Sequence, residues 1–126
     1  MKQEEKDLLL KDLCARLPYG VKCKSKYFVN DTLSGIIFDE EESVFNFSVN
    51  NEGFITQLYC HEFKPYLFPM SSMTAEQEME CQQIKHSYYY DDDSFVLFDW
   101  YDKNHIDYRG LIPMGLAIDA TGLNIY

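Results

Sequence analysis

The stretch VFNFSVNNEGFITQLYC, residues 44–60, decides the predicted fold of this chain. Apolar and polar residues alternate over 44–49, which is the pattern of a strand with one buried face, and 54–60 continues as a second strand. The letters NNEG at 50–53 are typical of a tight turn, because Asn and Gly tolerate positive φ angles. We therefore predict an antiparallel hairpin in the middle of the sequence.

Two more strands are predicted before this hairpin. Residues 21–28 read VKCKSKYF, with Lys22, Lys24 and Lys26 at alternate positions, and 32–38 follows after a turn. Four consecutive strands joined by short turns favour an antiparallel meander or a small half-open barrel. Because helices are predicted on both sides of the strands in sequence, the fold class is α+β.

The predicted N-terminal helix covers 4–17, EEKDLLLKDLCARL. Its acidic first turn complements the helix dipole, and Pro18 ends the run. Spacing by three and four residues predicts one buried face. This face consists of Leu10, Leu13, Cys14 and Leu17. Cys14 is accordingly expected to be buried and unreactive.

The second half of the chain combines an extended segment with C-terminal helices. Residues 64–74 contain two prolines, which favours an extended path over the surface rather than a place inside the sheet. Thr74 and Gln77 have the spacing of a capping box, so a helix is predicted after Thr74. Residues 94–105 fit either a helix or a strand, and aromatic residues spaced three apart favour the helix. A short last strand is expected at 116–118.

Length and charge restrict the function. The 126 residues, of which 46% are hydrophobic, suit a single domain spanning 1–126. Residues 1–26 carry 7 Lys or Arg against 4 Asp or Glu, a charge of +3, and residues 27–126 carry 4 against 17, a charge of −13. A surface this acidic repels phosphate backbones and anionic lipids, so neither a membrane nor a nucleic acid is expected as a partner.

The cysteines and the first residues indicate the compartment. The start of the chain lacks the basic and apolar regions of a secretory signal, and its four cysteines form no CxxC pair. A cytoplasmic location with reduced thiols is therefore expected. The nearest approach to a zinc-ligand set lacks the spacing of such sites, so no metal and no cofactor are predicted. This set is Cys60, His61, Cys81 and His86.

Three segments, LLLKDLCARLPYGVK (8–22), KPYLFPMSSMT (64–74) and DWYDKNHIDYRGLIPMGLAID (99–119), together cover 47 of 126 positions. They resemble parts of a set of short uncharacterised proteins from gut Bacteroides-type bacteria and their phages or mobile elements. The central part, 23–63, does not match that pattern, and Phe68 stands where those relatives more often have a basic residue. The resemblance implies one small α+β domain and implies no activity, catalytic residue or cofactor.

One candidate partner-binding surface is the run Tyr88, Tyr89, Tyr90, Asp91, Asp92 and Asp93. Tyrosines supply large contact area with a polar tip and are frequent at binding hot spots. Three consecutive tyrosines cannot all face one core from a regular strand or helix, so at least one is expected to be exposed.

A second candidate group lies near the C-terminus. We interpret His105, Asp107 and Arg109 as a structural tie, in which His105 and Asp107 end one helix and cap the next turn while Arg109 pairs with a carboxylate. The alternative is catalytic. Asp102 precedes His105 by three residues, and on a helix its carboxylate could orient the imidazole as a general base.

Together these observations favour a non-enzymatic, cytoplasmic protein-interaction module, an accessory factor of a bacterium or a mobile element. Its partner would be another protein or a second copy of the chain. One alternative is an acidic nucleic-acid mimic that inhibits a DNA- or RNA-binding protein, and another is a small enzyme using Asp102 and His105. Lys22, Lys24 and Lys26 are expected to protect an exposed edge strand rather than to bind nucleic acid.

Overall fold

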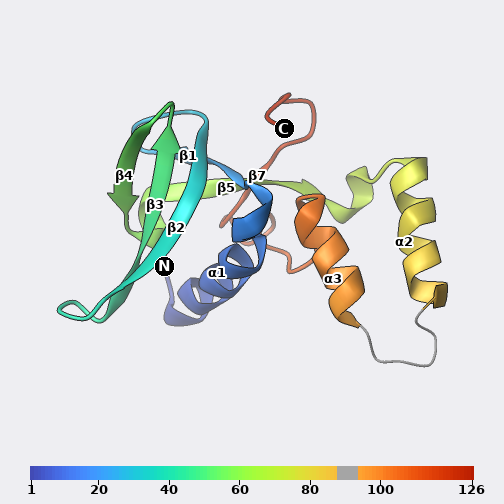
Figure 1. Ribbon diagram of the computed structural model, residues 1–126, viewed down its shortest axis with the longest axis horizontal. Helices are drawn as coiled ribbons and strands as arrows, with labels where there is room; N and C mark the ends of the chain where they lie inside the picture. The colour runs from blue at the N-terminus through green and yellow to red at the C-terminus, as the bar shows by residue number, and fades with distance from the viewer. Residues whose placement is uncertain (88–93) are drawn as a thin grey trace.

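The computed structural model describes residues 1–87 and 94–126 (Figure 1). The predicted α+β class is confirmed, since an N-terminal helix precedes a multi-stranded sheet and further helices follow. The helices are α1 (Gln3–Arg16), α2 (Ala75–Ser87) and α3 (Ser94–Lys103), with short 3₁₀ turns η1 (Leu17–Tyr19), η2 (Cys60–Glu62) and η3 (Met70–Ser72). The strands are β1 (Lys22–Ser25), β2 (Asp31–Asp39), β3 (Val44–Asn51), β4 (Phe54–Leu58), β5 (Phe63–Pro69), β6 (Ile106–Asp107) and β7 (Ile118–Asp119).

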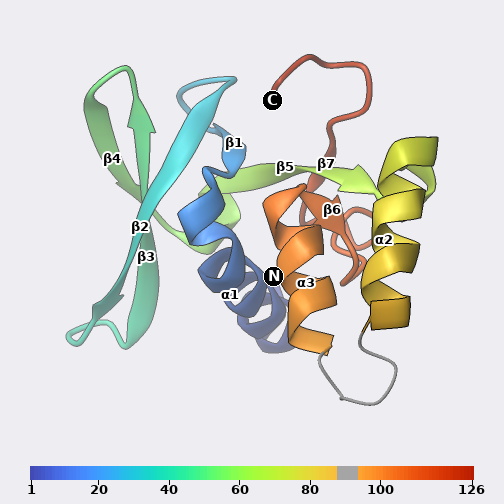
Figure 2. The ribbon, with the colours of Figure 1, turned by 45° about the vertical axis from the view of Figure 1, so that its right-hand side comes forward.

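The described residues contain one seven-stranded sheet in the order β4-β3-β2-β1-β5-β6, with β7 also paired to β5. β1 to β4 are the four strands expected from the sequence, and each pairs antiparallel with the next. The sheet is larger than the predicted four-stranded meander with one short last strand, because β5 pairs antiparallel with β1 and parallel with both β6 and β7. β5 therefore crosses the middle of the molecule and connects the β-rich part to the C-terminal segments (Figures 1 and 2).

The two prolines do not keep β5 out of the sheet, contrary to the sequence prediction. The Lys26 N–H donates to the Glu62 carbonyl, and the pairing then alternates along β1 until Cys23 and Pro65 form a non-hydrogen-bonded pair. Pro65 thus occupies a position where β1 needs no N–H from it. Pro69 is the last residue of β5, so its missing N–H does not interrupt the ladder.

The hairpin of β3 and β4 has the predicted tight turn. Asn51 pairs with Phe54 across a two-residue loop, and the loop residues Glu52 and Gly53 have φ angles of 49° and 92°. Two positive φ angles define a type I′ turn, whose twist matches that of the flanking strands. β4 is the last strand in the sheet order, so one of its two edges has no paired strand in the described residues.

The N-terminal helix is confirmed, but its buried face differs from the predicted one. The buried residues of α1 are Leu9, Asp12, Leu13 and Arg16. Cys14, expected to be buried, is exposed. The reason is that Asp12 and Arg16 are buried as an ion pair, so the face that packs against the protein lies one residue away from the face that apolar spacing selects.

The later helices agree with the sequence predictions. Thr74 Oγ1 accepts a hydrogen bond from the Gln77 N–H at 3.1 Å, and Gln77 Oε1 accepts one from the Thr74 N–H at 3.0 Å. This is the predicted capping box at the start of α2. Residues 94–105 fitted either a helix or a strand by sequence, and the structure contains the helix, α3. β7 lies at the place of the predicted last strand.

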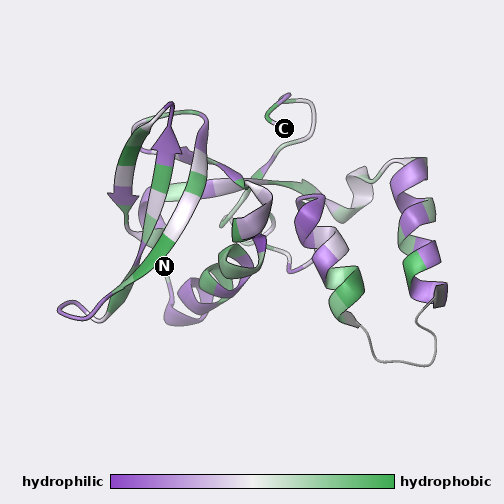
Figure 3. Ribbon diagram, in the orientation of Figure 1, coloured by the Kyte–Doolittle hydropathy of each residue, from purple (hydrophilic) through white to green (hydrophobic). Residues whose placement is uncertain are grey.

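Buried apolar side chains form two clusters. The larger one packs α1 against β1 to β5, and the smaller one packs α2 and α3 against β5 and β6. Leu67 belongs to the larger cluster and its neighbour Phe68 to the smaller one, because consecutive residues of a strand point to opposite faces. Figure 3 shows that hydrophobic residues also lie along the hairpin strands and at the start of α3.

Candidate functional site

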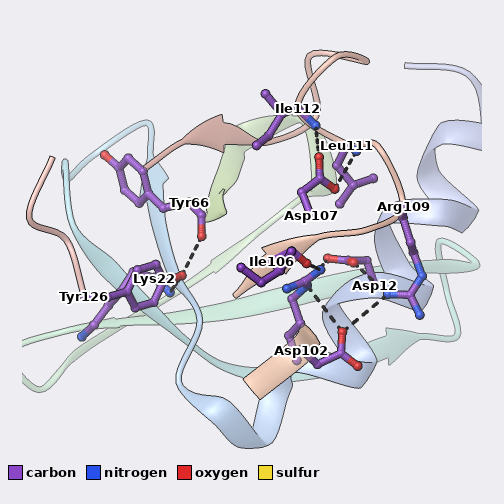
Figure 4. Close-up of polar contacts among 11 residues, drawn as sticks. Asp12, Lys22, Tyr66, Asp102, Ile106, Asp107, Arg109, Leu111, Ile112 and Tyr126 are labelled. Atoms are coloured by element: carbon purple, nitrogen blue, oxygen red, sulfur yellow. Dashed lines mark hydrogen bonds and ion pairs between the residues drawn. The ribbon is translucent and has the colours of Figure 1, made fainter. Parts of the chain in front are cut away.

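A buried cluster of charged side chains joins α1 to the C-terminal part of the chain (Figure 4). Arg16 and Asp12 of α1 are both fully buried. The Arg16 guanidinium donates from Nε to Asp12 Oδ2 at 2.9 Å and from Nη2 to the Ile106 carbonyl at 2.6 Å. One side chain of α1 thereby holds the first residue of β6, which lies 90 residues further along the chain.

Two more charged residues complete this cluster. Arg109 donates from Nη1 to Asp12 Oδ1 at 2.8 Å. Asp102 of α3 places its Oδ1 3.8 Å from both Arg16 Nε and Arg109 Nη1. The centroid of the Tyr108 ring lies 5.6 Å from Cζ of Arg16 and 4.5 Å from Cζ of Arg109, so the ring faces both guanidinium groups. Two arginines and two aspartates balance in charge, while Arg16 Nη1 and Asp102 Oδ1 are buried without a hydrogen-bond partner in the described residues.

Asp107 organises the turn that follows β6. Its two carboxylate oxygens accept hydrogen bonds from the N–H groups of Leu111 and Ile112, each at 2.9 Å. Asp107 is itself buried, so these bonds replace the water that its carboxylate would otherwise need. Asp107 and Arg109 therefore both hold the segment after β6 against the rest of the protein.

The His105 side chain contacts the C-terminal residue rather than pairing with the Asp102 carboxylate. Its ring stacks on the ring of Tyr126 with 3.8 Å between the centroids, and its Nδ1 is buried without a hydrogen-bond partner. Burial, and to a smaller extent the charge of Arg16, lowers the pKa of His105 to about 4. No hydrogen bond joins the Asp102 and His105 side chains, so the base-and-orienter pair that the enzyme hypothesis needs is not formed.

A groove opens beside this cluster, between α1 and α3. Among its lining residues are Phe98, Asp99, Asp102 and Arg109. Asp99 accepts a hydrogen bond from the Tyr19 hydroxyl, and Phe98 stacks on Tyr108. Asp99 and Arg109 thus already have hydrogen-bond partners within the chain.

A different surface gathers exposed apolar side chains at the free edge of β4. We call Tyr27, Phe28, Phe54 and Ile55 the apolar edge. The side chains of Phe54 and Ile55 are 65% and 62% exposed, and Tyr27 from the loop after β1 is 58% exposed. Phe28 meets Phe54 edge to face, with 6.5 Å between ring centroids. Together with Thr56 and Gln57 these residues line a shallow groove along β4.

The outer face of the hairpin, on which Ile55 lies, is poor in charge. The strand register places Ile55 beside Asn50 and Thr32, and Gln57 beside Ser48 and Gly35, on this one face. Ile37 and Asn46 extend it toward the end of β2. These residues of β2, β3 and β4 are uncharged, although 25% of the chain is charged, and Lys22 of β1 borders them by donating to the Thr32 hydroxyl. Depletion of charge is a property of the centres of protein interfaces.

The lysine stripe of β1 does not protect an edge, contrary to the sequence prediction. β1 is paired on both sides, by β2 and by β5. Lys22 donates to the Thr32 hydroxyl at 2.8 Å, and Lys26 forms an ion pair with Glu62. Two of the three lysines therefore have side-chain partners within the chain.

The predicted partner-binding run from Tyr88 to Asp93 lies outside the described residues. In the two described ranges, no group of three or more His, Cys, Asp or Glu side chains could hold a metal ion. The four cysteines are free, and burial raises the pKa of the Cys23 thiol to about 12. None of the described helices is long and apolar enough to cross a bilayer.

Sequence reasoning missed both the charge cluster and the apolar edge, although each has a signal. Asp12 and Arg16 are opposite charges four residues apart, which places them on one face of a helix. Phe54 and Ile55 are consecutive apolar residues directly after a turn. Because neighbours on a strand point to opposite faces, one of the two must lie on the outer face.

Comparison of the chain with protein-family models, with curated proteins and with solved structures gave no match. The geometry alone therefore has to carry any functional argument.

Proposed function

We propose that this protein is a non-enzymatic, cytoplasmic protein-interaction module, an accessory factor of a bacterium or a mobile element, which binds its partner through the apolar edge. One observation carries the proposal, namely the exposure of Phe54 and Ile55 on the unpaired side of β4. Contiguous apolar surface that a fold leaves in water is a feature of binding sites.

A partner that covers the apolar edge gains free energy by removing apolar side chains from water. Burying one large apolar side chain contributes roughly 1.5–3 kcal/mol relative to leaving it in water. Phe54, Ile55 and Tyr27 together could supply the hot spot of an interface, because a few large side chains usually dominate binding energy. The charge-poor face beside them would add area with little desolvation of charge.

The charged residues support the non-enzymatic part of the proposal. Asp12, Arg16, Asp102 and Arg109 form ion pairs with one another inside the protein. Their balance in charge favours a structural role for the cluster. Free cysteines, as in the reducing cytoplasm, accord with the proposed compartment.

The experiment is affinity capture with matched variants. The bait is the full chain, compared with Ile55→Ser and with Phe95→Ser, which removes a side chain of 79% exposure on α3. We expect the wild type and Phe95→Ser to retain the same protein at micromolar concentration and Ile55→Ser to lose at least about 90% of it, the loss that about 1.4 kcal/mol produces.

Two results would contradict the proposal. One is that the wild type retains no protein and does not self-associate. The other is that Phe95→Ser and Ile55→Ser lose the partner equally. A salt series separates the nucleic-acid mimic, for which retention should fall steeply with salt, from the apolar edge, for which it should fall only a few-fold.

A further inference from the structure

We infer that the partner binds by adding an extended segment to β4 as a further strand, and that this segment carries apolar residues at its centre and Lys or Arg at both ends. The inference rests on the proposed function and specifies its partner. Strand addition of this kind uses backbone hydrogen bonds for affinity and alternate side chains for specificity.

The turn determines which backbone groups of β4 are free. In a hairpin with a two-residue loop, the residues that flank the loop form a hydrogen-bonded pair, here Asn51 and Phe54. Hydrogen-bonded and non-hydrogen-bonded pairs alternate in antiparallel strands, so Phe54 and Thr56 direct their N–H and C=O groups toward β3. Ile55 and Gln57 therefore direct theirs away from β3, to the side where no described strand lies.

This edge has none of the usual features that prevent strand addition. Natural proteins protect exposed edges with lysine, proline or a β-bulge. β4 reads FITQL and contains neither lysine nor proline, and its register with β3 is unbroken over all five residues. By contrast, β2 and β3 carry a register shift between Leu33 and Gly35, where neither strand is at an edge.

Side chains on both faces of β4 would contact the added strand. Phe54 lies on the face of Val49 and Leu58, and Ile55 lies on the opposite face beside Asn50. Phe54 has Phe28 as an aromatic neighbour, so the groove along β4 can receive an apolar side chain on this side. Apolar residues near the centre of the incoming segment fit both faces.

Carboxylates lie at both ends of β4. Glu52 is in the turn before it, and Glu42 accepts a hydrogen bond at 2.8 Å from the hydroxyl of Tyr59, the residue after it. Basic residues at both ends of the partner segment would face these groups. A second copy paired antiparallel would instead bring Glu52 of one chain toward Glu42 of the other, which is unfavourable between like charges.

The probe is a nine-residue peptide of five consecutive valines with two lysines at each end. Its control replaces the four lysines by glutamates. We expect the basic peptide to bind the full chain and the acidic peptide to bind at least 10-fold more weakly, a difference of about 1.4 kcal/mol. Amide hydrogen exchange at Ile55 and Gln57 should slow on binding, because their N–H groups enter the new ladder.

Gln57→Pro is the decisive variant, with Gln57→Thr as its matched control. The proline removes the outward N–H but none of the bonds to β3, so the sheet is retained and the melting temperature should stay close to that of the wild type. Binding of the basic peptide should fall at least 10-fold in Gln57→Pro and less than 2-fold in Gln57→Thr, since the control keeps the N–H.

The outcomes separate this inference from the proposed function. Equal binding by the two Gln57 variants, unchanged exchange at Ile55, or no binding of the basic peptide at about 1 mM would overturn strand addition. If Ile55→Ser still loses the captured partner, the proposed function stands without it. A dimer in sedimentation that Gln57→Pro abolishes would show a second copy on this edge and would also overturn the inference.

Discussion

Around α1 and α3 the protein buries charge, whereas at the end of the β3–β4 hairpin it exposes apolar side chains. Arg16 and Asp12 have no exposed surface, while Phe54 and Ile55 are 65% and 62% exposed. The usual distribution of residue types is thus reversed in both regions. The difference teaches that neighbours, and not residue type, decide the role of a side chain here, since the buried charges are paired with opposite charges within the chain, whereas Phe54 and Ile55 stay mostly exposed.

The comparison also separates stability from binding. Removing one member of a buried ion pair leaves its partner charged and desolvated, so the fold depends on each member. An exposed side chain contributes little to folding, because its surroundings in the folded and unfolded chain are similar. Substitutions in the buried charge cluster should therefore lower the stability of the fold, whereas substitutions at the apolar edge should weaken partner binding and leave stability almost unchanged.

The largest effect on stability is expected for Arg16→Ala. It leaves Asp12 and Asp102 buried with less compensation and removes the bond to the Ile106 carbonyl. The free energy of unfolding should fall by about 3–5 kcal/mol, measured by urea denaturation.

Lys11→Ala is the matched control for Arg16→Ala. Lys11 is an exposed cation on the same helix, and its removal should change the unfolding free energy by less than about 0.5 kcal/mol. Equal effects of the two substitutions would mean that the buried cluster does not hold α1 to the C-terminal segments.

An intermediate effect is expected from His105 as the pH falls. The pKa of His105 is lowered by burial to about 4, against 6.5 in the unfolded chain. Between these values the unfolded state takes up a proton that the folded state does not, so stability is lost as the pH falls from 6.5 toward 4. Allowing for solvent screening at a partly exposed ring, the contribution is about 1 kcal/mol.

The His105→Asn variant isolates this contribution. Asn tolerates the left-handed backbone of this position, where φ is 59°, and does not titrate. The melting temperature of the wild type should therefore fall more than that of His105→Asn between pH 6.5 and 4.5, as followed by circular dichroism. If the melting temperatures of the two proteins fell equally between pH 6.5 and 4.5, His105 would be excluded as the cause of the pH dependence.

The smallest effect on stability is expected at the apolar edge. Ile55→Thr keeps a β-branched side chain, and the unfolding free energy should change by less than about 0.5 kcal/mol in chemical denaturation. Partner binding should nevertheless weaken. A loss of several kcal/mol on this substitution would show that Ile55 packs into the fold and would remove the contrast between the two regions.

Local patterns predicted much of the fold. The hairpin turn, the capping box at Thr74 and the helix α3 follow from residues close together in sequence, and the structure contains all three. β5 could not be predicted in the same way. Whether Pro65 interrupts a sheet depends on whether β1 needs its N–H, and this depends on register rather than on composition.

The candidate sites were less predictable. Hydropathy placed Cys14 inside and could not place Arg16 there, because two of the three groups that compensate this guanidinium, Asp102 of α3 and the Ile106 carbonyl of β6, are distant in sequence. The catalytic hypothesis rested on sequence spacing alone, and the side-chain directions of Asp102 and His105 do not follow from spacing. The exposure of Phe54 depends on which strand ends the sheet, which is a property of topology.

The bond from Arg109 to Asp12 spans 97 residues, and this has a consequence for folding during translation. On the ribosome, α1 emerges long before Asp102 and Arg109, which complete its buried charge cluster, whereas β3 and β4 are adjacent in sequence and can pair early. We therefore expect the nascent chain to display Phe54 and Ile55 while its first helix is still undocked. An early partner or a chaperone would meet that hairpin first.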